Sequence, residues 1–468
     1  MSGTELWRLS ATELAEAIRA GQASSAEAVE AHLRRIEAVN PAVNAITAVL
    51  AEQALAAAKA ADLLTAAGAG LPPLHGVPFT VKENIDLAGA PTTQGLKAFA
   101  DAWPRRDAPA VERLREAGGI PLGHTNCPNG ATRWHCESEL WGATINPWDR
   151  ARTPGASSGG EAVALATGMS PLGLGSDGLG SLRWPAQCCG ITALKPTLGR
   201  IPQATTIEPL DAQIGPQLTA VVGPMARRVA DLWAALAVLA GPAWRDPWAV
   251  PAPLRGPEPA RPIRVALVTR PAGQDLAPQV LDGLGKAARA LAAAGYAVEE
   301  TEPPSVGEAA QTLLDMLNTP DVRDWWQQAA PLVPPDTQRF LAEFYAVAGD
   351  PGPAATVRSF VTRASLVRAW GEFAERYPLI VAPVFTDIPF PAGTDLDEGR
   401  VAWTIRGMRM TMAVNALGLP AVALPVGTGG GLPQVVQLIG PRYREDLCLD
   451  AAAAVEDSAG ILTPIDPR

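Results

Sequence analysis

The sequence contains few of the side chains that hold metal ions. Its 468 residues include only four histidines and five cysteines. The histidines lack the H-E-x-x-H spacing of a metalloprotease, and the cysteines lack the C-x-x-C spacing of a zinc site. The odd number of cysteines in a long chain is typical of reduced thiols. We therefore expect no metal ion and no disulfide framework.

Positive charge and long apolar runs are also scarce. The net charge is −10, which leaves no general basic surface to follow a phosphate backbone. The strongest apolar run, 232–239, is far too short to span a bilayer, and residues 1–10 do not resemble a secretory leader. We expect a cytoplasmic protein that acts on small molecules, with no nucleic-acid or membrane partner.

Three regions of different composition follow one another along the chain. Residues 1–70 are rich in Ala, Glu and Leu with apolar residues at helical spacing, which predicts a helical N-terminal region. In residues 71–241, Pro and Gly punctuate short apolar runs and most of the unusual clusters occur. Residues 242–468 begin with a Pro-rich connection, 242–262. Because these stretches are too short to separate independent units, we expect one domain, 1–468.

The last region alternates between strand and helix patterns. We predict strands at 263–268 and 296–300 around a helix at 281–294, which makes a βαβ unit. Further strands are predicted at 379–384 and 421–426, with a helix over 406–417 between them. The predicted fold class is therefore α/β.

Two glycine-rich segments carry small hydroxyl groups. They are residues 153–160, TPGASSGG, and residues 175–183, GSDGLGSLR. Glycine this dense is unfavourable in regular elements and lets backbone N–H groups approach a ligand closely, so we expect functional loops here. A pair of tight turns is the alternative.

Two common motifs match these segments incompletely. Residues 155–159 fit G-x-S-x-G, but the order Ser, acid, His of an α/β-hydrolase fails because no histidine follows His135. A triad with histidine first stays open by position. Residues 173–178 fit the dinucleotide fingerprint G-x-G-x-x-G, but Pro185 follows soon after and the preceding strand and opening helix are not evident.

A third possibility needs no histidine. A neutral lysine can take the proton of a serine nucleophile, and Lys82 ends the apolar run 77–81, where a strand would carry its amine into a dry site. Keeping lysine neutral near pH 7 requires lowering its pKa by about 3 units, about 4 kcal/mol, which burial can supply. The alternative is a surface charge paired with Glu83 or Asp86.

Several segments in order resemble the amidase signature hydrolases, which include fatty acid amide hydrolase, bacterial acylamidases and the A subunit of the tRNA-dependent amidotransferase. The similar segments are 74–84, 144–149, 155–160, 173–185 and 189–197. The resemblance implies a single large domain, with a mixed central β-sheet covered by helices, and a reaction without a cofactor. Within it, residues 71–241 would be the signature core and 242–468 the remaining α/β part.

The resemblance also implies roles for individual residues. Lys82 would be the general base, Ser157 the bridging serine in a cis peptide bond, and Ser181 the nucleophile; 157 − 82 = 75 and 181 − 157 = 24 are the family's intervals. Asp177 and Arg183 resemble an ion pair that braces the nucleophile loop; two separate surface charges are the alternative. The backbone N–H groups predicted to hold the oxyanion are those of Gly178, Leu179, Gly180 and Ser181.

The expected reaction is hydrolysis of a carboxylic amide to acid plus ammonia or amine through an acyl-enzyme on Ser181, with esterase side activity as a further expectation. Arg133, Trp134 and Trp184 are candidates for the substrate pocket. Leu179 stands where the family usually has glycine, so fewer backbone conformations are open to this loop. The alternatives are the A subunit of a tRNA-dependent amidotransferase and an inactive binding protein on the same scaffold. Homodimers are common in the family and are one expectation here.

Overall fold

A computed structural model of the chain describes residues 5–68 and 70–468. The N-terminal region is helical, as predicted, with α1 (Ala11–Arg19), α2 (Ser25–Val43) and α3 (Ala51–Ala66). Ser10 and Ser24 each accept a hydrogen bond from the backbone N–H three residues on, and each N-cap N–H donates to the glutamate there. These capping boxes explain why α1 and α2 begin where they do.

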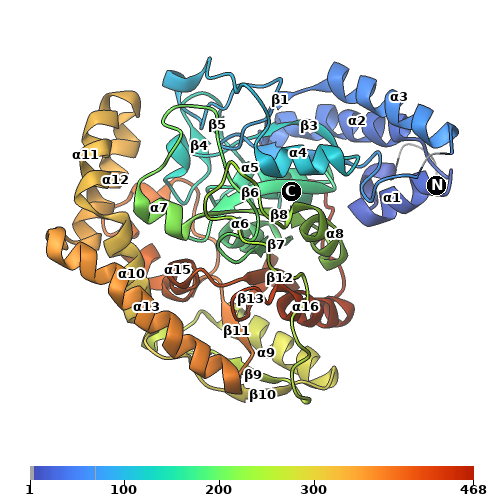
Figure 1. Ribbon diagram of the computed structural model, residues 1–468. Coiled ribbons are helices and arrows are strands. Elements are labelled where there is room, and N and C mark those ends of the chain that lie inside the picture. The colour runs from blue at the N-terminus through green and yellow to red at the C-terminus, as the bar shows by residue number, and fades with distance from the viewer. Residues whose placement is uncertain (1–4, 69) are drawn as a thin grey trace.

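One mixed sheet crosses the whole molecule. Its eleven strands lie in the order β1-β3-β2-β6-β8-β7-β12-β13-β11-β9-β10, from the top to the bottom of Figure 1. The bounds are β1 (Ile46–Val49), β2 (Pro78–Lys82), β3 (Ile120–Thr125), β6 (Leu172–Asp177), β7 (Thr192–Lys195), β8 (Val221–Ala226), β9 (Arg264–Leu267), β10 (Ala297–Glu300), β11 (Leu379–Pro383), β12 (Ala421–Gly429) and β13 (Leu432–Ile439). Because β7 pairs with β12, the two halves of the chain share one sheet and form a single large α/β domain.

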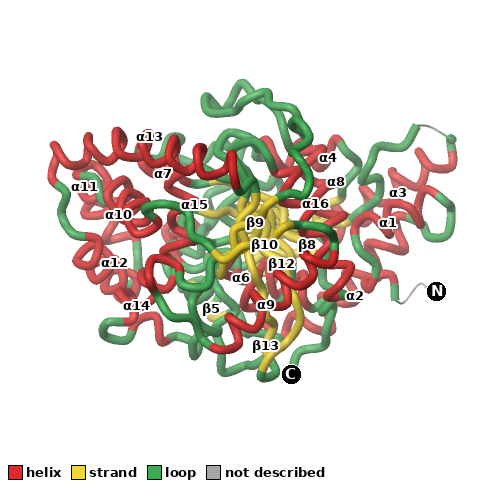
Figure 2. Tube along the Cα trace, turned by 90° about the horizontal axis from the view of Figure 1, so that it is seen from below, coloured by secondary structure: helices red, strands yellow, loops and turns green. Residues whose placement is uncertain are grey.

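Helices cover both faces of this sheet (Figure 2). One apolar core lies under α1, α4 (Pro109–Glu116), α8 (Val229–Leu239), α9 (Pro278–Ala293) and α16 (Glu445–Ala459). The other lies under α5 (Gly159–Ala166), α6 (Arg183–Cys189), α14 (Arg400–Gly407) and α15 (Arg409–Leu417). It extends to α10 (Val306–Leu317), α12 (Pro335–Ala348) and α13 (Gly352–Arg376), which with α11 (Pro320–Ala329) form the orange layer at the left of Figure 1.

The predicted βαβ unit is confirmed, because β9, α9 and β10 follow one another and the two strands pair in parallel. The helix predicted over 406–417 is two helices, α14 and α15. They are separated at Met408, whose backbone departs from helical geometry. Gly407 lies against the ring of Phe385, where an added Cβ would come within 2.3 Å. This tertiary contact is not visible in the local pattern.

The prediction of a loop over 175–183 is wrong for residues 175–177, which with Gly173 lie in the central strand β6. Close contacts explain why glycine stands in a strand here. A Cβ on Gly173 would lie 1.9 Å from the carboxyl of Glu161, and one on Gly175 would lie 2.7 Å from Leu182. The dinucleotide fingerprint also fails, since the strand runs through its glycines and the next helix, α6, starts only at Arg183.

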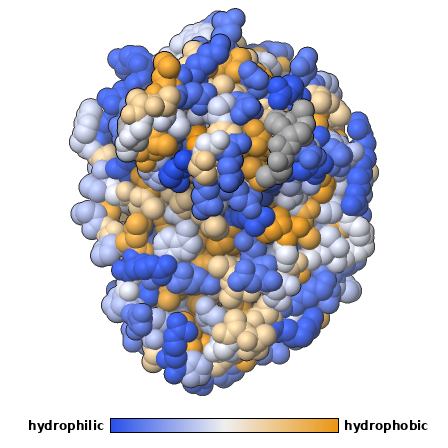
Figure 3. Space-filling model, turned by 90° about the vertical axis from the view of Figure 1, so that its right-hand side faces the viewer, coloured by the Kyte–Doolittle hydropathy of each residue, from blue (hydrophilic) through white to orange (hydrophobic). Residues whose placement is uncertain are grey.

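Within the described residues no helix is long and apolar enough to cross a membrane. On the face shown in Figure 3, hydrophobic patches are interrupted by hydrophilic side chains. Other short elements include α7 (Ile214–Thr219), several 3-10 turns and the two-stranded ribbon of β4 (Glu137–Ser138) and β5 (Gly142–Ala143).

Candidate active site

Lys82 is the last residue of β2, a strand with neighbours on both sides in the sheet. Its side chain is fully buried. The Nζ atom donates to Ser157 Oγ at 2.6 Å and to Ser176 Oγ at 2.8 Å. Burial lowers the pKa of Lys82 to about 8, and nearby thiols and carboxyls only partly oppose this effect. A substantial fraction of the amine is therefore neutral at mildly alkaline pH.

Ser157 lies in the loop that leads into α5. The peptide bond between Ala156 and Ser157 is cis, as the resemblance to the family implies. The preceding Gly155 has φ +77°, and a Cβ there would lie 2.6 Å from the Cα of Pro185. Glycine therefore allows this loop to lie directly against α6, the helix that follows Ser181.

Ser181 lies in the loop between β6 and α6. Ser158 N–H donates to the Ser181 carbonyl at 3.3 Å, which joins the two serine loops predicted from the sequence. Unlike Lys82 and Ser157, which are buried, Ser181 is partly exposed. Of the three, it is therefore the side chain that a substrate can reach from outside.

Asp177 and Arg183 form the predicted ion pair, and both side chains are fully buried. Arg183 Nε donates to Asp177 Oδ2 at 3.0 Å and Nη2 donates to Oδ1 at 3.2 Å. Burial disfavours the charged form of Asp177, but Arg183 outweighs it and holds the pKa of the carboxyl below its usual range. Asn415 and Gln437 accept hydrogen bonds from the same guanidinium at 2.6 and 2.9 Å, so α15 and β13 fix its orientation.

Asp177 also determines which backbone donors of the loop are free. The Gly180 N–H, at φ +98°, donates to Asp177 Oδ1 at 2.8 Å, and Leu182 N–H donates to Oδ2 at 3.2 Å. Gly180 is thus committed to the ion pair. The other predicted oxyanion donors, the N–H groups of Gly178, Leu179 and Ser181, have no hydrogen-bond partner within residues 5–68 and 70–468.

The three residues predicted for the substrate pocket lie in packed surroundings. Arg133 binds Asp395 through two hydrogen bonds of 3.0 Å and Asp336 through one of 2.6 Å, so its guanidinium faces carboxylates of the chain itself. Trp134 and Trp184 are buried, and the indole N–H of Trp184 donates to the Trp134 carbonyl at 3.1 Å. Their role in a pocket stays a prediction.

Both tryptophans belong to aromatic clusters. The ring of Trp184 lies 5.0 Å from that of Phe385 and 5.6 Å from that of Phe390. The ring of Trp134 lies 5.2 Å from that of Phe340. Because α6 starts two residues after Ser181, its Trp184 places aromatic surface close in sequence to the predicted nucleophile.

Sequence reasoning missed three polar residues around Lys82. Ser176 accepts hydrogen bonds from Lys82 and, at 3.1 Å, from Asn84 Nδ2. Glu161, a residue of α5, lies near the Lys82 amine. Ser176 had a usable signal, since it lies in the second glycine-rich segment, whereas nothing local distinguishes Glu161 from an exposed helix residue.

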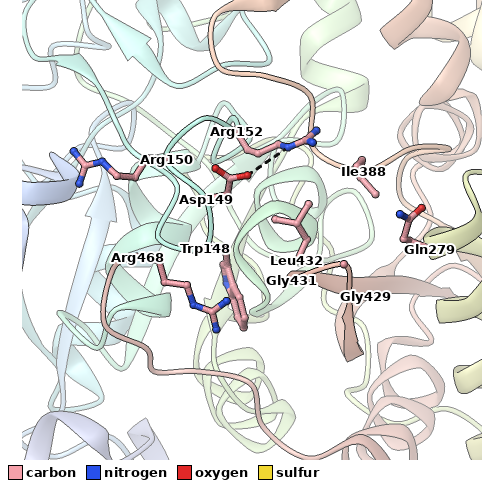
Figure 4. A pocket seen from close by; sticks show the side chains of 11 residues that line it. Trp148, Asp149, Arg150, Arg152, Gln279, Ile388, Gly429, Gly431, Leu432 and Arg468 are labelled. Carbon is pink, nitrogen blue, oxygen red and sulfur yellow. Dashed lines mark ion pairs between the residues drawn. The ribbon is translucent and has the colours of Figure 1, made fainter.

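A separate cavity of about 590 Å³ lies elsewhere on the molecule (Figure 4). Arg468 stacks over the ring of Trp148 there, and Asp149 pairs with Arg152 at 3.7 Å. None of the residues that line this cavity belongs to the predicted triad. The predicted triad therefore lies outside this cavity.

A family model described as Amidase matches residues 27–449. The chain belongs to the amidase family. It is 43% identical over 465 residues to an indoleacetamide hydrolase of Bradyrhizobium diazoefficiens, which covers 98% of this chain and 88% of that protein. It is 32% identical to an acylamidase of Rhodococcus erythropolis over 97% of this chain and 96% of that protein.

Solved structures agree with this assignment. The structure of 6-aminohexanoate cyclic dimer hydrolase complexed with substrate superimposes with a TM-score of 0.83 at 28% identity, covering 99% of each chain. Relatives named for amide hydrolysis therefore match nearly the whole amidase described here. The chain is an amidase that hydrolyses carbon–nitrogen bonds of carboxylic amides, and small-molecule amides suit it as substrates.

Proposed function

We propose that this amidase hydrolyses the primary amides of arylacetic acids, with indole-3-acetamide as the model substrate, through an acyl-enzyme on Ser181. The 2.6 Å hydrogen bond from the buried Lys82 amine to Ser157 carries the mechanism, together with the backbone hydrogen bond that joins the Ser157 loop to the partly exposed Ser181. The choice of acyl group is supported by the indoleacetamide hydrolase at 43% identity and by the aromatic side chains around Trp184.

In the acylation step, Ser181 Oγ attacks the amide carbonyl carbon. Its proton passes to the Ser157 hydroxyl, whose own proton moves to neutral Lys82 Nζ. The carbonyl oxygen gains negative charge, and the free N–H groups of Gly178, Leu179 and Ser181 are the donors proposed to hold it. Asp177 and Arg183 keep this loop in place through the Gly180 and Leu182 amides.

Collapse of the tetrahedral intermediate then breaks the carbon–nitrogen bond. Lys82 returns the proton through Ser157 to the leaving nitrogen, which departs as ammonia or amine. Water then attacks the Ser181 ester while its proton passes through Ser157 to Lys82, and Lys82 returns a proton through Ser157 to Ser181 Oγ as the carboxylic acid leaves. Every proton in this sequence moves between side chains of the chain, the substrate and water.

The pH dependence of the reaction follows from the state of Lys82. Only the neutral amine accepts a proton, and the pKa of Lys82 is lowered to about 8. We therefore expect kcat/KM to rise as the pH increases through about 8 and then to level off, as a steady-state pH profile with indole-3-acetamide would show. An acid limb near the ordinary lysine value of 10.5 would contradict a buried neutral base.

The substrate proposal is tested by ammonia release from a panel of amides. Indole-3-acetamide and phenylacetamide should be better substrates than an aliphatic amide of similar length, because aryl groups pack against aromatic side chains. Equal kcat/KM for the aliphatic amide would remove the aryl preference. Glutaminase activity that appears only with a partner protein would instead favour the amidotransferase subunit, and no turnover of any amide would favour the inactive scaffold.

We further propose that the enzyme works on free small molecules without nucleic acid, in line with its net charge of −10. The absence of a membrane partner, the cytoplasmic location, homodimer formation and esterase side activity remain predictions. Size-exclusion chromatography with light scattering and an aryl ester substrate test the last two.

A further inference from the structure

Glu161 is a buried glutamate beside the proposed base with no role in the proton relay. It is the third residue of α5, the helix that starts directly after Ser157 and Ser158. Its side chain is fully buried. One carboxyl oxygen is hydrogen-bonded to the Thr80 hydroxyl, and the other to the Thr125 hydroxyl at 2.8 Å.

These two threonines lie on either side of Lys82. Thr80 precedes Lys82 by two residues on β2, so both side chains point to the same face of the strand. Thr125 is the register partner of Lys82 on β3. Glu161 therefore connects the helix that follows Ser157 with the two strands that hold Lys82.

Glu161 forms no ion pair with any described residue, although the Lys82 amine lies nearby. Within the described parts of the chain, no lysine or arginine nitrogen lies at ion-pair distance from its carboxyl. The backbone of Gly173 approaches so closely that a Cβ there would lie 1.9 Å from the carboxyl oxygen. A dry carboxyl in contact with hydroxyls alone favours its neutral form, and burial raises the pKa of Glu161 to about 8.

Asp177 shows the opposite arrangement in the same site. It is equally buried, but it binds the Arg183 guanidinium and accepts hydrogen bonds from two backbone amides. Such surroundings favour a carboxylate. Two buried carboxyl groups in one active site are thus placed in environments that stabilise opposite protonation states.

The titratable groups that face Lys82 are Glu161, Asp177 and the thiols of Cys127 and Cys136, which follow β3. Burial raises the pKa of Cys127 well above its ordinary value and that of Cys136 to about 11, so both thiols are uncharged near neutral pH. Asp177 is neutralised by Arg183. A carboxylate at Glu161 would therefore add an uncompensated negative charge beside the amine, and it would favour the ammonium form.

We propose that Glu161 is a positioning residue whose carboxyl group is protonated near neutral pH, so that it braces Lys82 through Thr80 and Thr125 without placing a negative charge beside the amine. A protonated carboxyl can donate to one threonine hydroxyl and accept from the other. The proposal rests on the proposed function of Lys82 as the base. The protonation state itself can be measured without catalysis.

Infrared spectroscopy tests the protonation state directly. A protonated carboxylic acid has a C=O stretching band that carboxylates lack. At neutral pH the wild-type protein should show one such band that is absent from the spectrum of Glu161→Gln. The matched control is Glu445→Gln, because Glu445 is also buried but pairs with Arg200 at 2.8 Å. It should leave the band in place. A spectrum in which Glu161→Gln removes only carboxylate intensity would overturn the proposal.

Kinetics test the positioning role. Glu161→Gln keeps the shape and the neutrality of the group, so we expect the acid limb of kcat/KM to stay in place and kcat to fall no more than about threefold. Glu161→Ala and Thr80→Val break the brace and should lower kcat at least about tenfold with little change in KM.

An acid limb that moves down by about one pH unit in Glu161→Gln would show that the native group is charged, and would overturn the proposal. Equal kcat values for wild type and Thr80→Val would show that the hydrogen bond between Glu161 and Thr80 does not position Lys82. If Glu161→Ala does not fold, Thr80→Val and Thr125→Val still test it. Loss of the infrared band together with full activity in Lys82→Ala would show a failure of the proposed base, not of the protonated carboxyl.

Discussion

Replacing Lys82 by alanine is expected to lower kcat by about 10³- to 10⁴-fold, because the variant has no group to accept the Ser181 proton through Ser157. The KM value should change much less, since the amine is buried and its hydrogen bonds go to Ser157 and Ser176. Steady-state measurement of ammonia release from indole-3-acetamide gives both constants. The loss should exceed that of any single substitution outside the triad and its loop.

The control for this variant is Lys97→Ala. Lys97 is an exposed lysine that pairs loosely with Glu139 at 3.8 Å, and its removal should leave kcat unaltered. Circular dichroism should show that both variants are folded. If folded Lys82→Ala keeps more than about a tenth of the wild-type kcat, Lys82 is not the general base.

Replacing Arg183 by methionine is expected to lower the free energy of unfolding by about 3–5 kcal/mol, because it leaves the buried carboxylate of Asp177 without its counterion. Activity should fall as well, since Asp177 holds the Gly180 and Leu182 amides of the nucleophile loop. Urea denaturation followed by tryptophan fluorescence measures the change in stability.

An exposed ion pair provides the comparison. Arg228 lies 3.1 Å from Glu13, and both side chains are more than a third exposed. Because water screens such pairs, Arg228→Met should change the free energy of unfolding by less than about 1 kcal/mol. Similar losses in the two variants would mean that the Asp177–Arg183 pair is no more important for stability than a surface contact.

The parts of the fold that were predictable from the sequence are those with strong local patterns. The apolar runs at 263–268 and 379–384 and the amphipathic segment between 281 and 294 correspond to β9, β11 and α9. The serine segments and Lys82 were recognisable because several motifs occur in a fixed order. Two of these residues are close together in the structure, because Lys82 and Ser157, separated by 75 residues in the sequence, are hydrogen-bonded.

The rest depends on contacts between distant segments. Strand β6 contains glycines that indicate a loop locally, and only the close approach of Glu161 and Leu182 explains them. Asn415 and Gln437 orient Arg183 from more than two hundred residues away. Arg133 was a candidate for the substrate pocket, yet its buried guanidinium binds Asp395 and Asp336. No local pattern carries this information.

The central claim is that Ser181 is the nucleophile and that Lys82 activates it. The most direct test is to treat the purified protein with a serine-directed fluorophosphonate and to locate the adduct by peptide mass spectrometry, with Lys82→Ala as the comparison. We predict an adduct on Ser181 that forms much more slowly in the lysine variant. An adduct on Ser157, or equal labelling of Ser181 without Lys82, would contradict the claim.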